Sequence, residues 1–191
     1  MKIFLRTPLI ETDARGLKVS DIVYLTGTVL TIRDKASAHI LELIKKGEKL
    51  PINLNNSVIF HAGPIVKKHN GKFELLVIGP TTSSRMDKFQ PEIIKLGVRA
   101  IIGKGGMDHN TLMAMKEYGC VYLAATGGCG VFLGKKVQEI KNVQWLDFGI
   151  PEAVWELEVR DFGPLVVAMD SHGRSLYNEV ASSAKKLMQS F

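Results

Sequence analysis

The segment KFELLVIGPTTSSRMD, residues 72–87, changes abruptly from an apolar run to a cluster of small hydroxyl side chains. The run 75–78 is typical of a buried strand, and Gly79 and Pro80 end it. Two threonines, two serines, Arg85 and Asp87 follow immediately. We therefore expect a strand that delivers a polar loop to one edge of a sheet.

Working outward, the Asn70-Gly71 pair between the apolar segments 57–68 and 72–79 predicts a β-hairpin. Strands are expected at 22–32, 98–103 and 120–125, and helices at 34–47, 91–97, 108–119 and 130–141. The tail predicts two extended arms around residues 161–164, a turn at 172–173, and a closing helix at 181–189.

This alternation indicates the α/β class with a largely parallel central sheet. Strands joined by helices of this length pair in parallel through right-handed crossovers, so the middle of the chain is expected to be a doubly wound unit. Because no repeat, low-complexity tract or linker divides the sequence, we expect residues 1–191 to form a single domain.

The composition indicates a folded, soluble protein. Hydrophobic residues make up 46% of the chain and charged residues 23%, and no apolar run could cross a bilayer. Residues 1–16 lack the apolar stretch of a signal peptide, which favours the cytoplasm. The net charge of +6 comes from basic residues scattered among acidic ones, so nucleic-acid binding ranks low and an anionic substrate or an acidic partner subunit fits as well.

Cys120 and Cys129 are the only cysteines, too few for a disulfide framework or for a four-iron cluster. The histidines show no HxxxH or HExxH spacing, so no metal site is predicted, and His61 and His172 have no evident role. The glycine-rich segment 125–132 could bind an anion or activate Cys129, but tight backbone packing is favoured.

Three junctions after strands carry a cation beside hydroxyls or glycines: TIRDK with Arg33, GPTTSSRMD with Arg85 and IGKGGMD with Lys104. Ligands of an open α/β sheet bind beyond the carboxyl ends of its strands, where such junctions meet. Arginine grips a carboxylate through two parallel hydrogen bonds, and glycines let backbone N–H groups approach an anion. The set predicts a site for a small dicarboxylate.

Each feature also has a simpler structural interpretation. Threonines and serines before a helix usually cap it. Arg33 beside Asp34 and Arg85 near Asp87 are consistent with surface ion pairs of little energetic effect. The GKGGM turn lacks the spacing of a P-loop. Taken singly, these interpretations are favoured, so the dicarboxylate site depends on the cations acting together.

Seven motifs along nearly the whole chain resemble the β subunit, or C-terminal domain, of class I iron–sulfur fumarate hydratases and the related tartrate dehydratases. They are LRTPL (5–9), GTVLTIRD (27–34), HAGPIV (61–66), GPTTSSRMD (79–87), IIGKGGM (101–107), AATGGCG (124–130) and PEAVWELEVRDFGPLVVAMDSHGRSLY (151–177). The resemblance implies a hydro-lyase that reversibly adds water to fumarate to give malate, on a swivelling β/β/α domain. It also implies a [4Fe-4S] cluster held by three cysteines of a partner α subunit, none bound by this chain, and an α2β2 assembly.

By the same resemblance, Thr81 is the residue placed to take the C3 proton, and Arg33, Thr82, Arg85 and Lys104 bind the substrate. A threonine hydroxyl loses a proton only far above pH 7, so this role needs help from Arg85, from burial or from an acid of the partner.

One position departs from the family pattern, in which a histidine follows the RD pair by three residues. Ser37 occupies that position, and a histidine comes only at His39. The departure leaves room for tartrate or another hydroxy-dicarboxylate as substrate. A dicarboxylate-binding module without catalytic activity is the alternative from another class of protein.

Overall fold

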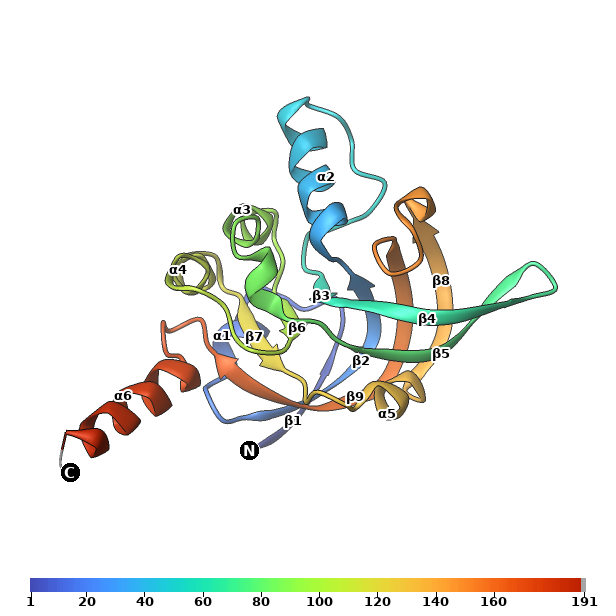
Figure 1. Cartoon of the computed structure of the whole chain (residues 1–191). Coiled ribbons are helices and arrows are strands. Elements are labelled where there is room, and N and C mark those ends of the chain that lie inside the picture. Colours follow the sequence, from blue (N-terminus) through green and yellow to red (C-terminus); the bar gives the residue numbers. More distant parts are fainter. Residues whose placement is uncertain (190–191) are drawn as a thin grey trace.

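A computed structural model of the chain describes residues 1–189 and shows a mixed α/β architecture around one curved sheet (Figure 1). Seven strands form this sheet in the order β1-β2-β3-β6-β7-β9-β8. Their bounds are β1 Lys2–Arg6, β2 Ile22–Thr31, β3 Val58–Phe60, β6 Ala100–Gly103, β7 Val121–Ala124, β8 Val137–Gln144 and β9 Val154–Met169. The remaining strands, β4 Ala62–His69 and β5 Lys72–Pro80, pair with each other.

The strand directions confirm the parallel expectation only in part. Strands β1, β2, β3, β6 and β7 pair in parallel, whereas β9 runs antiparallel to β2, β7 and β8. Because β9 pairs with both β7 and β2, the pairings β2–β3–β6–β7–β9–β2 close a ring. The parallel strands also follow their chain order, so residues 1–189 lack the reversal of a doubly wound sheet, and that prediction is wrong.

Three crossover helices share one face of the sheet: α2 Asp34–Lys45, α3 Gln90–Lys95 and α4 His109–Tyr118 (Figure 1). They contribute Ile40, Ile93 and Met115 to one buried apolar cluster. Strand β3 shows how the sheet separates its two cores, because Ile59 belongs to this cluster while its neighbours Val58 and Phe60 belong to the other.

The second cluster fills the opposite face of the sheet. Its largest members, Trp155, Phe60 and Phe162, are fully buried, and the Phe60 and Phe162 rings meet edge to face at 5.5 Å. The short helix α1, Glu11–Gly16, adds Ala14. With both faces of the sheet covered, the polar strand ends are left as the place for chemistry.

The hairpin prediction is confirmed. Asn70 and Gly71 have φ values of 48° and 79°, as a tight turn between twisted strands requires. The predicted arm 57–68, however, divides into β3, which belongs to the large sheet, and β4, which belongs to the hairpin. His61 is the single residue between these two strands.

The helix predicted at 130–141 is wrong beyond its first turn. Only α5, Gly130–Gly134, is helical, and the edge strand β8 follows. In β8 the partly buried Val137, Ile140 and Val143 recur every third residue, and two register shifts in the β8–β9 ladder produce this spacing in a strand. In α5 a Cβ on Gly130 would lie 2.8 Å from Val77 Cγ1, whereas a Cβ on Gly127 or Gly128 would meet nothing within 4 Å, so the tight-packing interpretation of the glycine-rich segment holds only at Gly130.

The tail has the two extended arms, but they form one strand. The backbone bends at Asp161, where φ is 48°, yet β2 pairs with β9 on both sides of the bend, Gly27 with Val159 and Val23 with Leu165. The final helix α6, Leu176–Met188, begins five residues earlier than predicted because Ser175 caps it by accepting from the Asn178 N–H.

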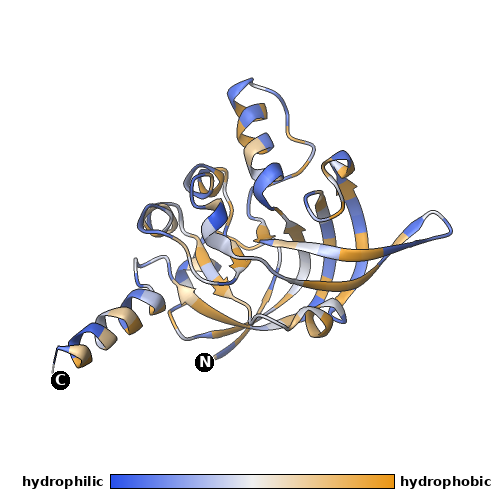
Figure 2. Ribbon diagram, viewed as in Figure 1, coloured by the Kyte–Doolittle hydropathy of each residue, from blue (hydrophilic) through white to orange (hydrophobic). Residues whose placement is uncertain are grey.

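Helix α6 projects from the body, and apolar and polar residues alternate along it (Figures 1 and 2). Val180 and Met188 are 61% and 78% exposed. A short 3-10 helix, η2 Leu146–Phe148, links β8 to β9. Within residues 1–189 we find no helix with the length and apolar character needed to span a membrane.

Candidate functional site

The segment after β5 lies along the loop that follows β6. The Thr81 N–H donates to the His61 carbonyl oxygen at 2.7 Å, and the Lys104 N–H donates to the Thr81 carbonyl oxygen at 3.3 Å. The Ser83 N–H then donates to the Lys104 carbonyl oxygen at 3.0 Å, so that Thr82 and Lys104 form an isolated parallel bridge. Backbone hydrogen bonds therefore fix the two loops side by side.

The threonines of this segment are not helix caps. The 3-10 helix η1, Ser83–Met86, begins directly after Thr82, whose side chain makes no capping hydrogen bond. No hydrogen bond of the Thr81 hydroxyl is found within residues 1–189. The capping interpretation thus fails for both residues, and the partly exposed Thr81 hydroxyl is available to a ligand.

Arg33 stands at the junction of β2 and α2, with its side chain only 18% exposed. Its Nη2 lies 3.0 Å from Glu152 Oε1, and its Nε lies 4.0 Å from Asp34 Oδ2. That Nε is buried without a hydrogen-bond partner in the described chain. A Cβ on Gly63 would lie 2.9 Å from Arg33 Nη1, so the glycine of HAGP makes room for the guanidinium against the hairpin.

Arg85, on η1, pairs with a residue of α2. Its Nε donates to Asp34 Oδ1 at 3.1 Å and its Nη2 donates to Asp34 Oδ2 at 2.8 Å, a bidentate arrangement. The predicted ion pair between Arg85 and Asp87 is therefore wrong, because the partner of Arg85 is Asp34. Asp87 instead accepts from the Asp108 N–H at 3.1 Å, which ties η1 to the start of α4, and partial burial raises the pKa of its carboxyl group.

Lys104 begins the glycine-rich loop after β6. Its ammonium group makes no ion pair within residues 1–189, in contrast to Arg33 and Arg85. Gly106, with φ of 75°, lies against the Tyr177 ring, which a Cβ would approach to 2.6 Å. The loop is thus shaped by close packing on α6 and leaves the lysine without an internal counter-charge.

These contacts join all of the predicted site residues into one cluster. Asp34 lies between the Arg33 and Arg85 guanidinium groups, and the backbone bridge connects Thr82 to Lys104. Two of the three cations already face carboxylates, which leaves Lys104 and the unbonded Arg33 Nε as the centres without a partner in the described residues. Such a cluster could accept an added carboxylate.

Ser37 lies one turn beyond Asp34 on α2. It is fully buried, and its hydroxyl oxygen has no hydrogen-bond partner within residues 1–189. His39 does not take its place, because the His39 ring packs edge-on against Trp145 and Phe148 at 4.9 and 5.3 Å. The departure at this position therefore leaves a small buried hydroxyl in the first turn of α2, where the Ser37 N–H donates to the Arg33 carbonyl oxygen at 2.8 Å.

A buried polar network beneath the segment was missed from the sequence. His61 Nδ1 lies 3.0 Å from Ser83 Oγ, His61 Nε2 lies 3.1 Å from Gln90 Oε1, and the Tyr122 hydroxyl donates to Ser83 Oγ at 2.9 Å. Desolvation lowers the pKa of His61 to about 4, so the ring is neutral near pH 7. The available signal was a histidine directly after a three-residue apolar strand, where a solvent-exposed role is improbable.

The chain does not offer the donors that an iron–sulfur cluster needs. Within residues 1–189 no group of three or more His, Cys, Asp or Glu side chains could hold a metal ion. Cys120 is fully buried and Cys129 is partly buried, and desolvation raises the pKa of both thiols. Activation of Cys129 by a helix N-terminus is therefore not supported.

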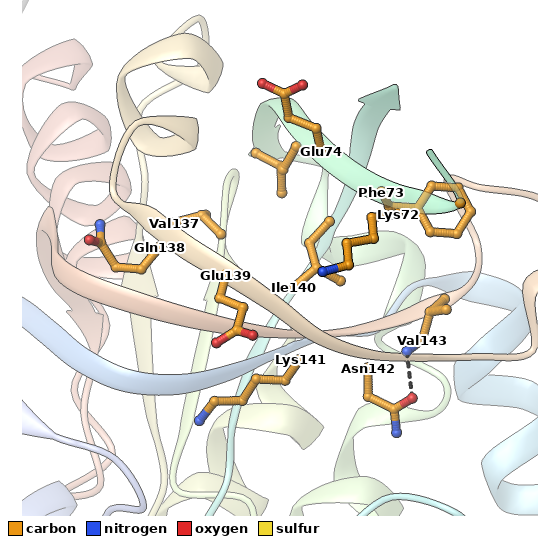
Figure 3. A pocket seen from close by; sticks show the side chains of 12 residues that line it. Lys72, Phe73, Glu74, Val137, Gln138, Glu139, Ile140, Lys141, Asn142 and Val143 are labelled. Atoms are coloured by element: carbon orange, nitrogen blue, oxygen red, sulfur yellow. Dashed lines mark hydrogen bonds between the residues drawn. The ribbon is translucent and has the colours of Figure 1, made fainter. Parts of the chain in front are cut away.

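A groove of about 690 Å³ lies elsewhere, between β5 and β8. Figure 3 shows Phe73, Ile140 and Val143 along it, with Lys72 and Glu139. Neither this groove nor three smaller pockets is lined by the predicted site residues.

Comparison with known proteins gives a match over most of the chain. The model of the family described as fumarase C-terminus matches residues 1–180. A "Putative L(+)-tartrate dehydratase subunit beta" of Methanocaldococcus jannaschii is 55% identical over 174 residues, which are 90% of this chain and 89% of that protein.

Two further relatives differ in length. The L(+)-tartrate dehydratase subunit beta of Escherichia coli is 41% identical over 180 residues, covering 94% of this chain and 88% of the relative. A "Putative fumarate hydratase class I" of Geobacillus stearothermophilus is 43% identical over 190 residues, covering 98% of this chain but 36% of that longer protein. The similarity thus extends to proteins named as β subunits and to part of a longer protein.

Proposed function

The chain belongs to the fumarase C-terminus family, and on that premise we propose that it is the β subunit of a hydro-lyase acting on a small dicarboxylate. Its reaction is the reversible hydration of fumarate to malate, or the corresponding dehydration of tartrate. The observation that carries this proposal is the partly exposed, unbonded Thr81 hydroxyl in a cluster with Arg33, Arg85 and Lys104.

The cations bind the two carboxylates of the substrate. Arg33 supplies a guanidinium group whose side chain is 18% exposed, and Lys104 offers an ammonium group without a counter-charge among the described residues. Arg85, oriented by two hydrogen bonds to Asp34, presents its remaining donors, and the Thr82 backbone closes the binding surface. A dianion restores the charge balance that Lys104 lacks within the chain.

Thr81 faces the carbon that loses or gains the proton. Its hydroxyl is a weak base on its own, because efficient bases have a pKa near the working pH. Within this chain the adjacent imidazole cannot help it, since both nitrogens of His61 are engaged by Ser83 and Gln90. Thr81 therefore either relays a proton to a group on the partner subunit or holds the substrate for that group.

The partner is an α subunit that carries the [4Fe-4S] cluster, in an α2β2 assembly in the cytoplasm. Two features support a partner: the Thr81 cluster lines none of the four pockets described above, and the two thiols here do not suit a cluster. The names of the β-subunit relatives point the same way. A swivelling motion of this domain would open and close the shared site.

The proposal has two candidate substrates, fumarate (or malate) and tartrate. Fumarate and malate follow from the motif resemblance, whereas the names of two relatives that match this chain almost end to end favour tartrate. Ser37, which stands where the family pattern has a histidine, leaves room for this second candidate.

The test is anaerobic reconstitution of the chain with its α subunit, assayed on L-malate, fumarate and L(+)-tartrate. We expect turnover of at least one substrate and a loss of kcat of about a hundredfold or more in Thr81→Ala, the scale seen when one positioned catalytic group is removed. Ser84→Ala is the matched control, because Ser84 is an exposed hydroxyl on the same segment. Unchanged turnover in Thr81→Ala would favour the non-catalytic binding module instead.

A further inference from the structure

His61 connects three parts of the candidate site through its backbone alone. It lies between β3 and β4 and is fully buried. Its N–H donates to the Ile102 carbonyl oxygen of β6 at 2.8 Å, and its carbonyl oxygen accepts the Thr81 N–H at 2.7 Å. One residue therefore fixes the position of Thr81 relative to the strand that leads into Lys104.

The His61 side chain contacts the same segment at a second residue, Ser83, two positions after Thr81. The contact atom of Gln90 is its side-chain amide oxygen Oε1, which can only accept a hydrogen bond. The proton of the neutral His61 ring therefore lies on Nε2, and Nδ1 accepts from the Ser83 hydroxyl. Ser83 Oγ in turn accepts from the Tyr122 hydroxyl. The hydrogen bonds run in one direction, from Tyr122 through Ser83 and His61 to Gln90.

The sequence around the network is adapted to it. A Cβ on Gly103 would overlap Ser83 Oγ and would lie 2.9 Å from the Tyr122 hydroxyl oxygen. Only glycine at this position lets Ser83 and Tyr122 meet beside the β6 strand. The hydrogen bonds at His61, Ser83 and Tyr122 favour one arrangement of the buried network, while Gln90 Nε2 has no partner within residues 1–189.

We infer that His61 is a positioning residue for the reaction: through its carbonyl oxygen at Thr81 and its imidazole at Ser83, it fixes the direction in which the Thr81 hydroxyl faces the substrate. The inference rests on the function proposed above. His61 does not touch the substrate, because it is fully buried and both ring nitrogens are engaged. Its effect reaches the reacting atoms through the Thr81–Ser83 backbone.

Two substitutions test the contacts of the two ring nitrogens of His61 separately. In His61→Asn the amide oxygen replaces Nδ1 and can still accept from Ser83, whereas in His61→Gln the longer amide reaches the place of Nε2 and keeps the contact with Gln90. Both remove the aromatic ring, and His61→Asn leaves the larger void at this buried site, so a loss of packing alone would make His61→Asn the more impaired variant, the reverse of the order expected here. We expect kcat of the reconstituted complex to fall at least tenfold in His61→Gln, with KM changed less than about threefold, and to stay within about threefold of the parent in His61→Asn.

A second measurement needs no substrate. Hydrogen exchange of the Thr81 and Ser83 amides in the full chain is expected to speed up at least tenfold in His61→Gln and to stay near the parent rate in His61→Asn. Ser83→Ala, which removes the same bond from the other side, should reproduce His61→Gln and replaces it if that variant does not fold. Tyr122→Phe, which keeps the Ser83–His61 bond, is the control.

The outcomes are distinct. Equal exchange rates at Thr81 in all variants, or equal losses of kcat in His61→Asn and His61→Gln, would overturn the positioning role. If the exchange pattern holds but the parent complex turns over neither malate nor tartrate, then the network fixes the loop and it is the proposed function that fails.

Discussion

The Asp34 carboxylate holds the Arg85 guanidinium by two hydrogen bonds, of 3.1 and 2.8 Å, across the gap between α2 and η1. The same carboxylate lies 4.0 Å from the Nε of Arg33. One acidic residue therefore orients one arginine and lies beside the other. A substrate carboxylate that reaches this cluster meets donors whose directions are already set, which lowers the entropic cost of binding.

The first prediction follows from this geometry. Arg85→Lys keeps the charge but loses the planar fork, so we expect KM for the dicarboxylate to rise about tenfold. The free energy of unfolding should change by less than about 1 kcal/mol, because the pair is half exposed at Arg85. Steady-state kinetics and urea unfolding measure both. Arg174→Lys, which breaks a comparable contact with Glu179 on the tail, is the control and should leave KM unchanged.

The second prediction concerns Lys104, the cation of the cluster without an ion pair within residues 1–189. Lys104→Met should raise KM at least tenfold and leave the thermal midpoint within about 2 °C, since no internal charge contact is lost. Lys67→Met on the exposed hairpin removes the same net charge and should have no effect on KM. An equal rise in both variants would mean that overall charge, and not this site, attracts the substrate.

Local signals were enough to predict the elements around the site. The Asn70-Gly71 turn, the Gly119 end of α4 and the strand-to-helix junctions at Arg33 and Lys104 are encoded within a few residues, and each is found as expected. Strand β8 was not predictable in this way. Its apolar spacing of three results from register shifts against β9, whose paired residues lie 10 to 22 positions further along the chain.

The candidate site shows the same division. The sequence places cations and hydroxyls at the junctions. It does not reveal that Asp34 forms its bidentate contact with Arg85 and not with its neighbour Arg33. It also hides the role of His61, whose partners Ser83, Gln90 and Tyr122 are 22 to 61 positions distant and meet only when the sheet has formed. Long-range packing decides both.

The third prediction tests the space reserved beside Ser83. Gly103→Ala introduces a methyl group that overlaps Ser83 Oγ, and the neighbouring backbone of β6 limits relief, so we expect a loss of about 2–3 kcal/mol in the free energy of unfolding. Gly127→Ala is the matched control, because a Cβ there meets nothing within 4 Å. Urea titration of both variants measures the difference, and equal stabilities would contradict the packing argument.

The last prediction uses the titration of His61. Desolvation holds the pKa of its folded-state imidazole at about 4, against an ordinary value of 6.5, while the nearby Asp34 charge acts in the opposite sense. Between these two values the unfolded chain binds a proton that the folded chain does not, so stability falls as the pH drops through this window. This pKa difference corresponds to a loss of about 2 kcal/mol in the free energy of unfolding between pH 7 and pH 5.

The variant His61→Asn lacks the titrating group but keeps every carboxylate. Over this pH range, the free energy of unfolding of the parent should therefore fall by about 2 kcal/mol more than that of the variant in urea titrations. Parallel losses in the two proteins would show that His61 is protonated without cost in the folded state, and hence that its ring is not held neutral between Ser83 and Gln90.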